Sequence, residues 1–173
     1  PNPGLTVVEI MEAIYEKKIQ GLYVMGENPA MSDPNANHAR EALARLDTLV
    51  VQDIFLTETA YLADIVLPAS AFPEKTGTFT NTDRRVQLAR KAVNPPGDAR
   101  QDWWIIQELA KRFDLNWNYH GPDEIYDELR NCMDSIKNIS WERLVKEGAV
   151  TYPCDDEDKP GNEVIFGEGV PTD

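Results

Sequence analysis

Three short apolar runs constrain the fold of this chain more than any other feature. They lie within residues 21–26 (GLYVMG), 46–53 (LDTLVVQD) and 63–68 (ADIVLP), and helical or turn-rich sequence separates them. An alternation of strands and helices with short loops favours a parallel sheet, because parallel neighbours need a crossover between them. Such crossovers are almost always right-handed. The sequence therefore predicts an α/β fold with parallel strands.

Helical spacing accounts for much of the remaining sequence. Residues 5–18 carry apolar side chains on one predicted helix face, at Val8, Met11, Ile14 and Tyr15. Further helices are predicted over residues 36–46, 102–113, 122–133 and 140–147. In the helix over 102–113, Asp102 is the expected N-cap. Its expected apolar face consists of Trp103, Ile106, Leu109 and Ala110.

We assign the fold as α/β, a three-layer Rossmann-like domain with a mostly parallel sheet and helices on both faces. This domain is expected to cover residues 1–150. Residues 151–173 are predicted to be a linker toward a C-terminal domain, because they are rich in turn-forming residues. The chain opens Pro-Asn-Pro without a Met, so we expect it to be a segment of a longer protein.

Charge and composition argue against two classes of partner. The net charge of −13, from 17 basic and 30 acidic side chains, disfavours duplex nucleic acid. No apolar run approaches the roughly 20 residues of a membrane-spanning helix. We therefore expect no nucleic acid and no membrane contact from this segment. Residues 114–173 hold 15 acidic and 5 basic residues, so the earlier part of the chain is nearly neutral and compatible with phosphate binding.

The cysteines and histidines form no metal-ligand pattern. Cys132 and Cys154 have no second cysteine pair, and His38 and His120 stand alone. Both cysteines are interpreted as structural or incidental. No residue of this segment is predicted to bind a metal.

Two polar positions follow the first two predicted strands. After the first comes Gly26-Glu27-Asn28-Pro29, where backbone N–H groups could cradle a phosphate, although the loop lacks the GxGxxG pattern and also reads as an ordinary turn. Asp53 ends the second strand, 25 residues after Asn28. An acid about 20 residues beyond a phosphate loop commonly binds ribose hydroxyls. The alternative is a local cap, with Thr57 and Thr59 capping their own turn.

Two further positions are rich in hydrogen-bonding groups. Residues 74–85 (EKTGTFTNTDRR) combine hydroxyls, an amide and three cations, which suits a polyoxygenated ligand or, equally, a polar hairpin. Asp102 could accept two parallel hydrogen bonds from the N1–H and N2–H₂ groups of guanine, which adenine cannot offer. Its role as an N-cap is the alternative.

Together these stretches resemble one family. "MGENP", "VVQDIFLTETAYLADIVLPAS", "EKTGTFTNTDRRVQ" and "NPPGDARQDWWIIQELAKR" occur in the order and spacing of the nucleotide-binding domain of molybdopterin oxidoreductases of the dimethyl-sulfoxide-reductase class. Within that class they are most similar to the catalytic alpha subunit of formate dehydrogenase. The resemblance covers residues 20–113 and continues more weakly through "YPCDDEDKPG".

The resemblance implies that the domain over 1–150 holds the nucleotide part of one molybdopterin guanine dinucleotide, two of which bind molybdenum or tungsten in that family. It implies five cofactor-binding residues here: Asn28, Gln52, Asp53, Lys75 and Asp102. We expect the Asn28 loop at phosphate or ribose, Gln52 and Asp53 at ribose, Lys75 at the polar face of the cofactor, and Asp102 at guanine. Thr57 and Arg84 are possible second-line contacts.

The family's catalytic parts are not recognisable in this sequence. The four-cysteine motif of the iron–sulfur cluster, the metal-ligating Cys or selenocysteine, and the C-terminal barrel have no counterpart here. The resemblance therefore implies a non-catalytic segment of a cytoplasmic formate dehydrogenase, although a periplasmic parent stays open. Its partners would be the remaining domains of the same chain and electron-transfer subunits. The alternatives are a nitrate reductase, the large subunit of an NADH dehydrogenase, or a free-standing nucleotide-binding module.

Overall fold

The computed structural model describes residues 3–164. The chain forms two compact units: unit 1, Pro1–Ala71 with Pro95–Asp102, and unit 2, Phe72–Asn94 with Trp103–Asp173. The chain thus leaves unit 1 once and returns to it. Among the described residues, no helix has the length and apolar character needed to cross a membrane.

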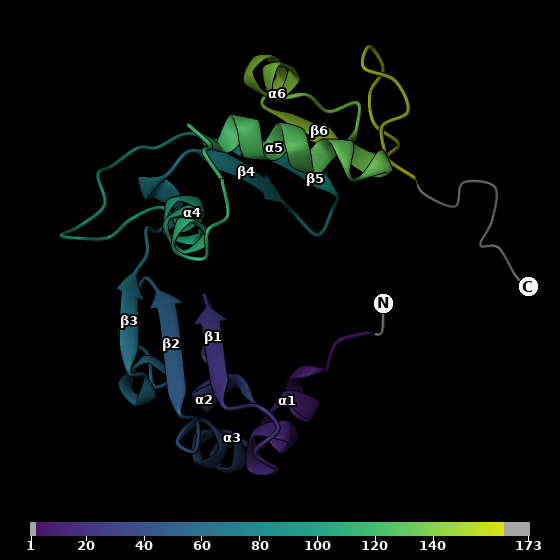
Figure 1. The fold of residues 1–173 in the computed structure, drawn as a ribbon. Helices are drawn as coiled ribbons and strands as arrows, with labels where there is room; N and C mark the ends of the chain where they lie inside the picture. The colour runs from purple at the N-terminus through teal and green to yellow at the C-terminus, as the bar shows by residue number, and fades with distance from the viewer. Residues whose placement is uncertain (1–2, 165–173) are drawn as a thin grey trace, which may run out of the picture. The chain divides into compact units, whose positions relative to one another are not determined.

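Unit 1 is a three-stranded parallel sheet with helices (Figure 1). The order along the chain is α1 (Val7–Tyr15), β1 (Gly21–Met25), α2 (Pro29–Ser32), α3 (Ala36–Leu43), β2 (Thr48–Asp53), the 3₁₀ turn η1 (Ala60–Leu62) and β3 (Ile65–Pro68). This confirms the predicted α/β class with a parallel sheet and helices. Both predicted helices of this unit exist but end earlier than expected.

Local interactions and backbone geometry explain where helix α1 begins and ends. Thr6 and Glu9 form a capping box: the Thr6 side chain accepts from the Glu9 N–H, and the Glu9 carboxylate accepts from the Thr6 N–H at 2.7 Å. The helix ends before Lys17, whose φ of 57° is incompatible with a continued right-handed helix.

The strands are in register across β1, β2 and β3. Val24 lies opposite Val51, and Val51 lies opposite Val66. Beyond β3, an isolated parallel bridge joins Ala69 to Arg100. The returning segment 95–102 therefore continues the sheet of unit 1 beside the end of β3.

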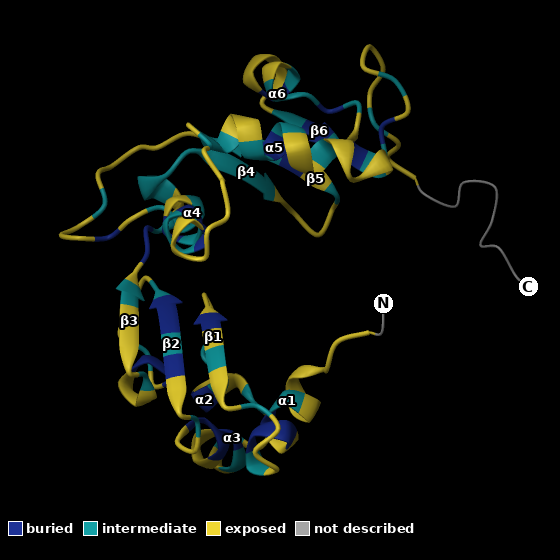
Figure 2. Cartoon of the chain, in the orientation of Figure 1, coloured by how far each residue is buried: buried dark blue, intermediate teal, exposed yellow. Residues whose placement is uncertain are grey.

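The core of unit 1 lies on one face of this sheet. Val24, Leu49 and Val51 share that face, because alternate residues of a strand point to the same side. Helices α1 to α3 cover it with Met11, Ile14, Ala30, Ala39, Ala42 and Leu43. The middle of β2 is accordingly among the most deeply buried parts of the unit (Figure 2).

Unit 2 contains an antiparallel sheet with the order β4-β5-β6. Its elements are η2 (Phe72–Glu74), β4 (Gly77–Thr80), β5 (Arg85–Ala89), α4 (Asp102–Arg112), α5 (Pro122–Asn131), η3 (Asp134–Ile136), α6 (Trp141–Glu147) and β6 (Ala149–Thr151). Strands β4 and β5 form the hairpin that was one of the two interpretations of residues 74–85. A second core gathers Val86, Tyr126, Ile136, Ile139, Leu144, Val150 and Cys154.

Helix α4 differs in detail from its prediction. It begins at Asp102 itself, so the expected N-cap is the first helical residue. Its buried residues are Ile105, Gln107 and Ala110. Of the expected apolar face only Ala110 is fully buried, and the polar side chain of Gln107 is buried through its hydrogen bonds to the backbone of Tyr119.

The start of the predicted linker is held by arginines. The Arg84 guanidinium donates to the carbonyls of Tyr152, Asn162 and Glu163, and Arg143 donates to that of Lys159 at 2.6 Å. Residues 165–173 of the predicted linker lie outside the described residues. The predicted domain boundary at residue 150 stays a prediction.

Replacement of Leu49 by Ala tests the core of unit 1. Leu49 is 1% exposed at the centre of the sheet, so we expect a loss of about 2–5 kcal/mol in the free energy of unfolding, measured by urea denaturation. Leu56→Ala makes the same change at an exposed side chain and should cost less than about 0.5 kcal/mol. Equal losses in the two variants would contradict the assigned core.

Candidate functional site

The carboxyl ends of β1, β2 and β3 meet at one edge of the sheet of unit 1, because the strands are parallel. The Gly26 N–H donates to the Gln52 carbonyl at 2.9 Å, and the Ala69 N–H donates to the Asp53 carbonyl at 3.0 Å. Gly26 has a φ of 64°, a conformation that suits glycine. Ligands of open α/β sheets bind at this kind of edge.

Asn28 fastens the loop after β1 to the loop after β2. Its Oδ1 accepts from the Thr59 N–H at 3.1 Å and from the Thr59 hydroxyl at 2.7 Å, and its Nδ2 donates to Glu58 at 2.7 Å. This donated bond lowers the pKa of the Glu58 carboxyl. The buried Thr59 hydroxyl also accepts from the Ala30 N–H at 3.1 Å. The side chain of Asn28 is thus used to shape the edge.

Asp53 both closes its own turn and presents an oxygen. Its Oδ1 accepts from the N–H groups of Ile54 at 2.7 Å and Phe55 at 3.2 Å. Its Oδ2 has no hydrogen-bond partner within residues 3–164. The two interpretations of Asp53, local cap and ligand contact, are therefore compatible in this geometry.

The two threonines after Asp53 behave differently from each other. The Thr57 hydroxyl accepts from the Ala60 N–H at 3.2 Å, so Thr57 caps η1 as predicted. The prediction that Thr59 also caps its own turn is wrong. Its hydroxyl is committed to Asn28 and Ala30 instead.

The returning segment brings Asp102 to the same edge. The Arg100 N–H donates to the Pro68 carbonyl at 3.0 Å, and the Ser70 N–H donates to the Arg100 carbonyl at 2.9 Å. Two residues later, the Asp102 Oδ1 accepts from the Gln52 Nε2 at 2.7 Å. This hydrogen bond joins two residues that are 50 positions apart in the sequence.

Gln52 lies between Asp102 and a residue that sequence reasoning missed, Tyr23. The Gln52 side chain has 0% exposure, and the Tyr23 hydroxyl donates to its Oε1. Burial and the negative charge of Asp102 raise the pKa of the Tyr23 phenol. Tyr23 could have been found from its place in β1, two residues before Met25, because Met25 pairs with Gln52. That inference requires the register between the two strands, which the sequence alone does not provide.

Sequence reasoning also missed Ser70. Its hydroxyl oxygen is buried two residues after β3 and has no hydrogen-bond partner among the described residues. A hydroxyl directly after the third apolar run was the available signal. An unsatisfied buried polar atom at this edge needs a water or a ligand.

Two predicted residues lie in unit 2. Lys75 follows η2 and precedes β4, and it is half-buried. Arg84 is in the turn between β4 and β5 with a φ of 66°, where its guanidinium holds three backbone carbonyls. The structure brings together Asn28, Gln52, Asp53 and Asp102 within unit 1, and a cofactor contact from Lys75 stays a prediction.

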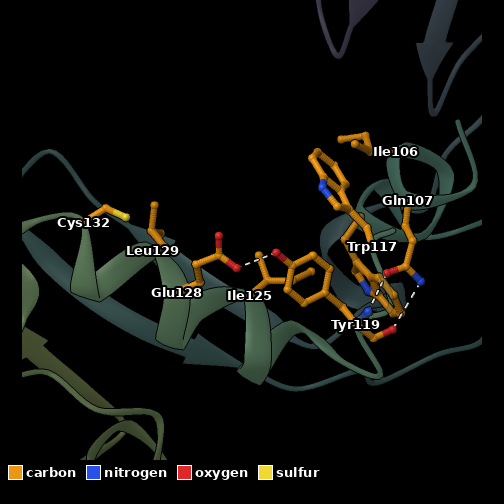
Figure 3. Close-up of a pocket in the computed structure, with 9 residues that line it drawn as sticks. Ile106, Gln107, Trp117, Tyr119, Ile125, Glu128, Leu129 and Cys132 are labelled. Carbon is orange, nitrogen blue, oxygen red and sulfur yellow. Dashed lines mark hydrogen bonds between the residues drawn. The ribbon is translucent and has the colours of Figure 1, made fainter. Parts of the chain in front are cut away.

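Unit 2 has a separate apolar pocket of about 380 Å³ (Figure 3). The Tyr119 ring stands at its centre, with its hydroxyl donating to Glu128 and its backbone held by Gln107. None of the predicted site residues lines this pocket, which is formed by Trp103, Ile106, Gln107, Trp117, Tyr119, Ile125, Glu128, Leu129 and Cys132. We therefore place the candidate site at the edge of unit 1.

The edge of unit 1 presents acceptor oxygens and backbone N–H groups. Asp53 and Asp102 supply carboxylates, which accept hydrogen bonds from hydroxyl and ring N–H groups. Among residues 3–164, no three His, Cys, Asp or Glu side chains are grouped to hold a metal ion. The hydrogen-bonding groups of this edge are of the kinds that suit a polar organic ligand.

Comparisons with known proteins agree on one family. Residues 1–112 match the family model described as molybdopterin oxidoreductase. The chain is 49% identical, over its whole length, to the F420-dependent formate dehydrogenase subunit alpha of Methanocaldococcus jannaschii, of which it covers 26%. It is also 49% identical, over 83% of its length, to the putative formate dehydrogenase YrhE of Bacillus subtilis, of which it covers 15%.

A solved structure shows the same fold. Acetylene hydratase from Pelobacter acetylenicus matches 84% of this chain with a TM-score of 0.67 and 26% identity, over 20% of its own length. The chain therefore spans about a quarter or less of the length of each of these proteins.

Thr59→Val tests the fastening of the two loops. Valine keeps the shape of threonine but loses the bonds to Asn28 and Ala30, so we expect a loss of about 1–3 kcal/mol in the free energy of unfolding. Thr48→Val is the matched control, because Thr48 is exposed at the start of β2. Urea denaturation measures both variants, and a Thr59→Val effect as small as the control would contradict this role.

Proposed function

Because the chain belongs to the molybdopterin oxidoreductase family, we propose that unit 1 holds the guanosine part of one molybdopterin guanine dinucleotide. The observation that carries the proposal is the placement of two carboxylates at the carboxyl edge of a parallel sheet: Asp53 ends β2, and Asp102 accepts a hydrogen bond from the preceding residue, Gln52. The segment itself binds and orients the nucleotide and performs no chemical step.

The donor pattern of guanine fits Asp102. A carboxylate has two oxygens and about four lone-pair sites, so Oδ1 can keep its bond from Gln52 while the group accepts N1–H and N2–H₂ of guanine. Adenine presents an acceptor at N1 and would face the carboxylate unfavourably. Asp102 therefore supports a guanine rather than an adenine nucleotide.

Sugar and phosphate would follow along the same edge. The Oδ2 atom of Asp53, without a partner among the described residues, suits the ribose hydroxyls. In the loop after β1, the backbone N–H groups of Glu27 and Asn28 would face the phosphates, and the Asn28 side chain holds that loop in place. We assign Lys75 to the polar face of the cofactor.

The parent protein is proposed to be a formate dehydrogenase alpha subunit, which oxidises formate to carbon dioxide. Support comes from the two relatives at 49% identity, of which one is named a formate dehydrogenase subunit alpha and the other a putative formate dehydrogenase. The molybdenum or tungsten of the complete cofactor would supply the two-electron chemistry. Its ligands and an iron–sulfur cluster would belong to other parts of the parent chain.

Another member of the family is the second candidate. The likeness to acetylene hydratase supports it, because that protein has the same fold under a different named activity. We prefer formate dehydrogenase because identity to the relatives of that name is 49%, against 26% for acetylene hydratase. The partners we propose are the remaining domains of the chain and electron-transfer subunits, in the cytoplasm.

Calorimetric titration of the chain with GDP and ADP tests the guanine assignment. We expect weak, saturable binding of GDP, because the site lacks the preorganisation that a complete enzyme supplies, and no binding of ADP. Asp102→Asn replaces one acceptor oxygen by a donor and should weaken GDP binding at least about tenfold. Asp98→Asn, the same change at an exposed carboxylate, should leave it unchanged. Absent GDP binding, or equal binding of ADP, would contradict the proposal.

A comparison of GDP with 2′-deoxy-GDP tests the ribose role of Asp53. Removal of one hydroxyl should weaken binding to the unmodified chain about tenfold, because a bond to a charged group is lost. In Asp53→Asn the turn bonds to Ile54 and Phe55 can persist through the remaining carbonyl oxygen. The preference for the ribose form should then shrink to about twofold or less. A preference that survives the substitution would assign the ribose contact to another residue.

A further inference from the structure

The amide of Gln52 is buried within unit 1. Its side chain is 0% exposed at the end of β2, and both ends of the amide are engaged. Oε1 accepts from the Tyr23 hydroxyl, and Nε2 donates to the Asp102 Oδ1 at 2.7 Å. Because the side chain has no exposed surface, a ribose could reach this amide only if neighbouring groups moved aside.

The direction of the hydrogen bonds is fixed by their end groups. The carboxylate of Asp102 can only accept, so it requires the NH₂ end of Gln52. The Oε1 atom must then face Tyr23, whose hydroxyl must donate. A flipped amide would place Oε1 against a carboxylate, so only one orientation satisfies all three groups.

Tyr23 lies in β1 and Gln52 in β2, and Asp102 is the last residue of the returning segment of unit 1. Tyr23 and Gln52 lie on the same face of neighbouring strands, because Gln52 pairs with Met25, two residues after Tyr23. Asp102 arrives through the bridge between Ala69 and Arg100. Each end of the chain of hydrogen bonds is thus anchored in the sheet.

We propose that Tyr23 and Gln52 are positioning residues, which hold the Asp102 carboxylate in the orientation that selects a guanine base. This inference rests on the proposed guanine role of Asp102. The bond from Nε2 restrains rotation of the carboxylate and so fixes the plane in which its oxygens accept hydrogen bonds. Guanine presents two donors in one plane, N1–H and N2–H₂. A fixed carboxylate therefore increases the affinity for guanine more than the affinity for a base that offers one donor.

The raised pKa of Tyr23 agrees with this arrangement. Burial contributes most, and the negative charge of Asp102 adds to it, so the phenol stays protonated as a donor. Tyr23 is still 39% exposed, which makes Tyr23→Phe a mild substitution that should fold. The phenylalanine keeps the ring and removes only the hydroxyl that directs the amide.

The first part of the test needs no ligand. NMR spectra of the ¹⁵N-labelled chain follow the side-chain NH₂ group of Gln52, identified by its loss in Gln52→Met. We expect slow hydrogen exchange of this group because it is buried. Its resonances should shift in both Tyr23→Phe and Asp102→Asn. Tyr61→Phe is the control, because Tyr61 is 74% exposed in the same unit, and it should leave them in place.

The second part measures base selectivity by titration with GDP and IDP, whose base lacks the 2-amino group. The unmodified chain should prefer GDP about tenfold, since one bond to a carboxylate is at stake. In Tyr23→Phe and Gln52→Met this ratio should fall to about threefold or less. If Tyr23 and Gln52 had a purely structural role, the substitutions would weaken the binding of GDP and IDP equally and leave the ratio of the two affinities unchanged.

The outcomes separate this inference from the proposed function. The positioning role is overturned if the ratio of GDP to IDP affinity is unchanged in both Tyr23→Phe and Gln52→Met. It is also overturned if the Gln52 resonances do not shift in either Tyr23→Phe or Asp102→Asn. If the unmodified chain binds neither nucleotide while those resonances respond, the hydrogen bonds exist but the guanine assignment fails, and the positioning role fails with it. Loss of the GDP preference together with a responsive resonance supports the proposal.

Discussion

The parallel pairing of β1, β2 and β3 is the constraint on which unit 1 depends. Parallel strands end at a common edge, so residues that follow different strands converge without any local sequence relationship. The same pairing places Val24, Leu49 and Val51 on the face covered by the helices. The core and the candidate site are therefore two results of one sheet: side chains along the strands form the core, and loops beyond them form the site.

Much of this arrangement was predictable from local sequence. The apolar runs predicted all three strands, since a buried strand needs little more than continuous apolar residues. The position of Asp53 after such a run predicted its place at the edge. By contrast, the three-residue strand β6 was missed, because it exists only through its pairing with β5, more than 60 positions earlier. Thr59 was misjudged for a similar reason: its partner Asn28 lies in a different loop.

The site shows the same limit more sharply. Asn28, Gln52 and Asp53 were predicted as site residues with the help of family motifs, but their hydrogen-bond partners in the structure were not predicted. Tyr23 reads as one more apolar residue of a strand, and its hydroxyl acquires a role only once Met25 is known to pair with Gln52. Single-sequence patterns report which face a residue takes within its own strand. They do not report which neighbour it meets, since that depends on register between strands.

The excursion of the chain into unit 2 has a consequence for synthesis. Unit 1 is interrupted after Ala71 and resumes only at Pro95, and the bridge to Arg100 completes its sheet. A nascent chain that has emerged only as far as β3 lacks both this bridge and the carboxylate of Asp102. On a ribosome that adds about 5–20 residues each second, the first unit must therefore wait a second or more, while the β4–β5 hairpin emerges ahead of its closing segment. During that interval the Pro68 carbonyl and the Ser70 N–H lack the backbone of Arg100, with which they pair in the finished unit, and a premature pairing at this place would compete with the native one.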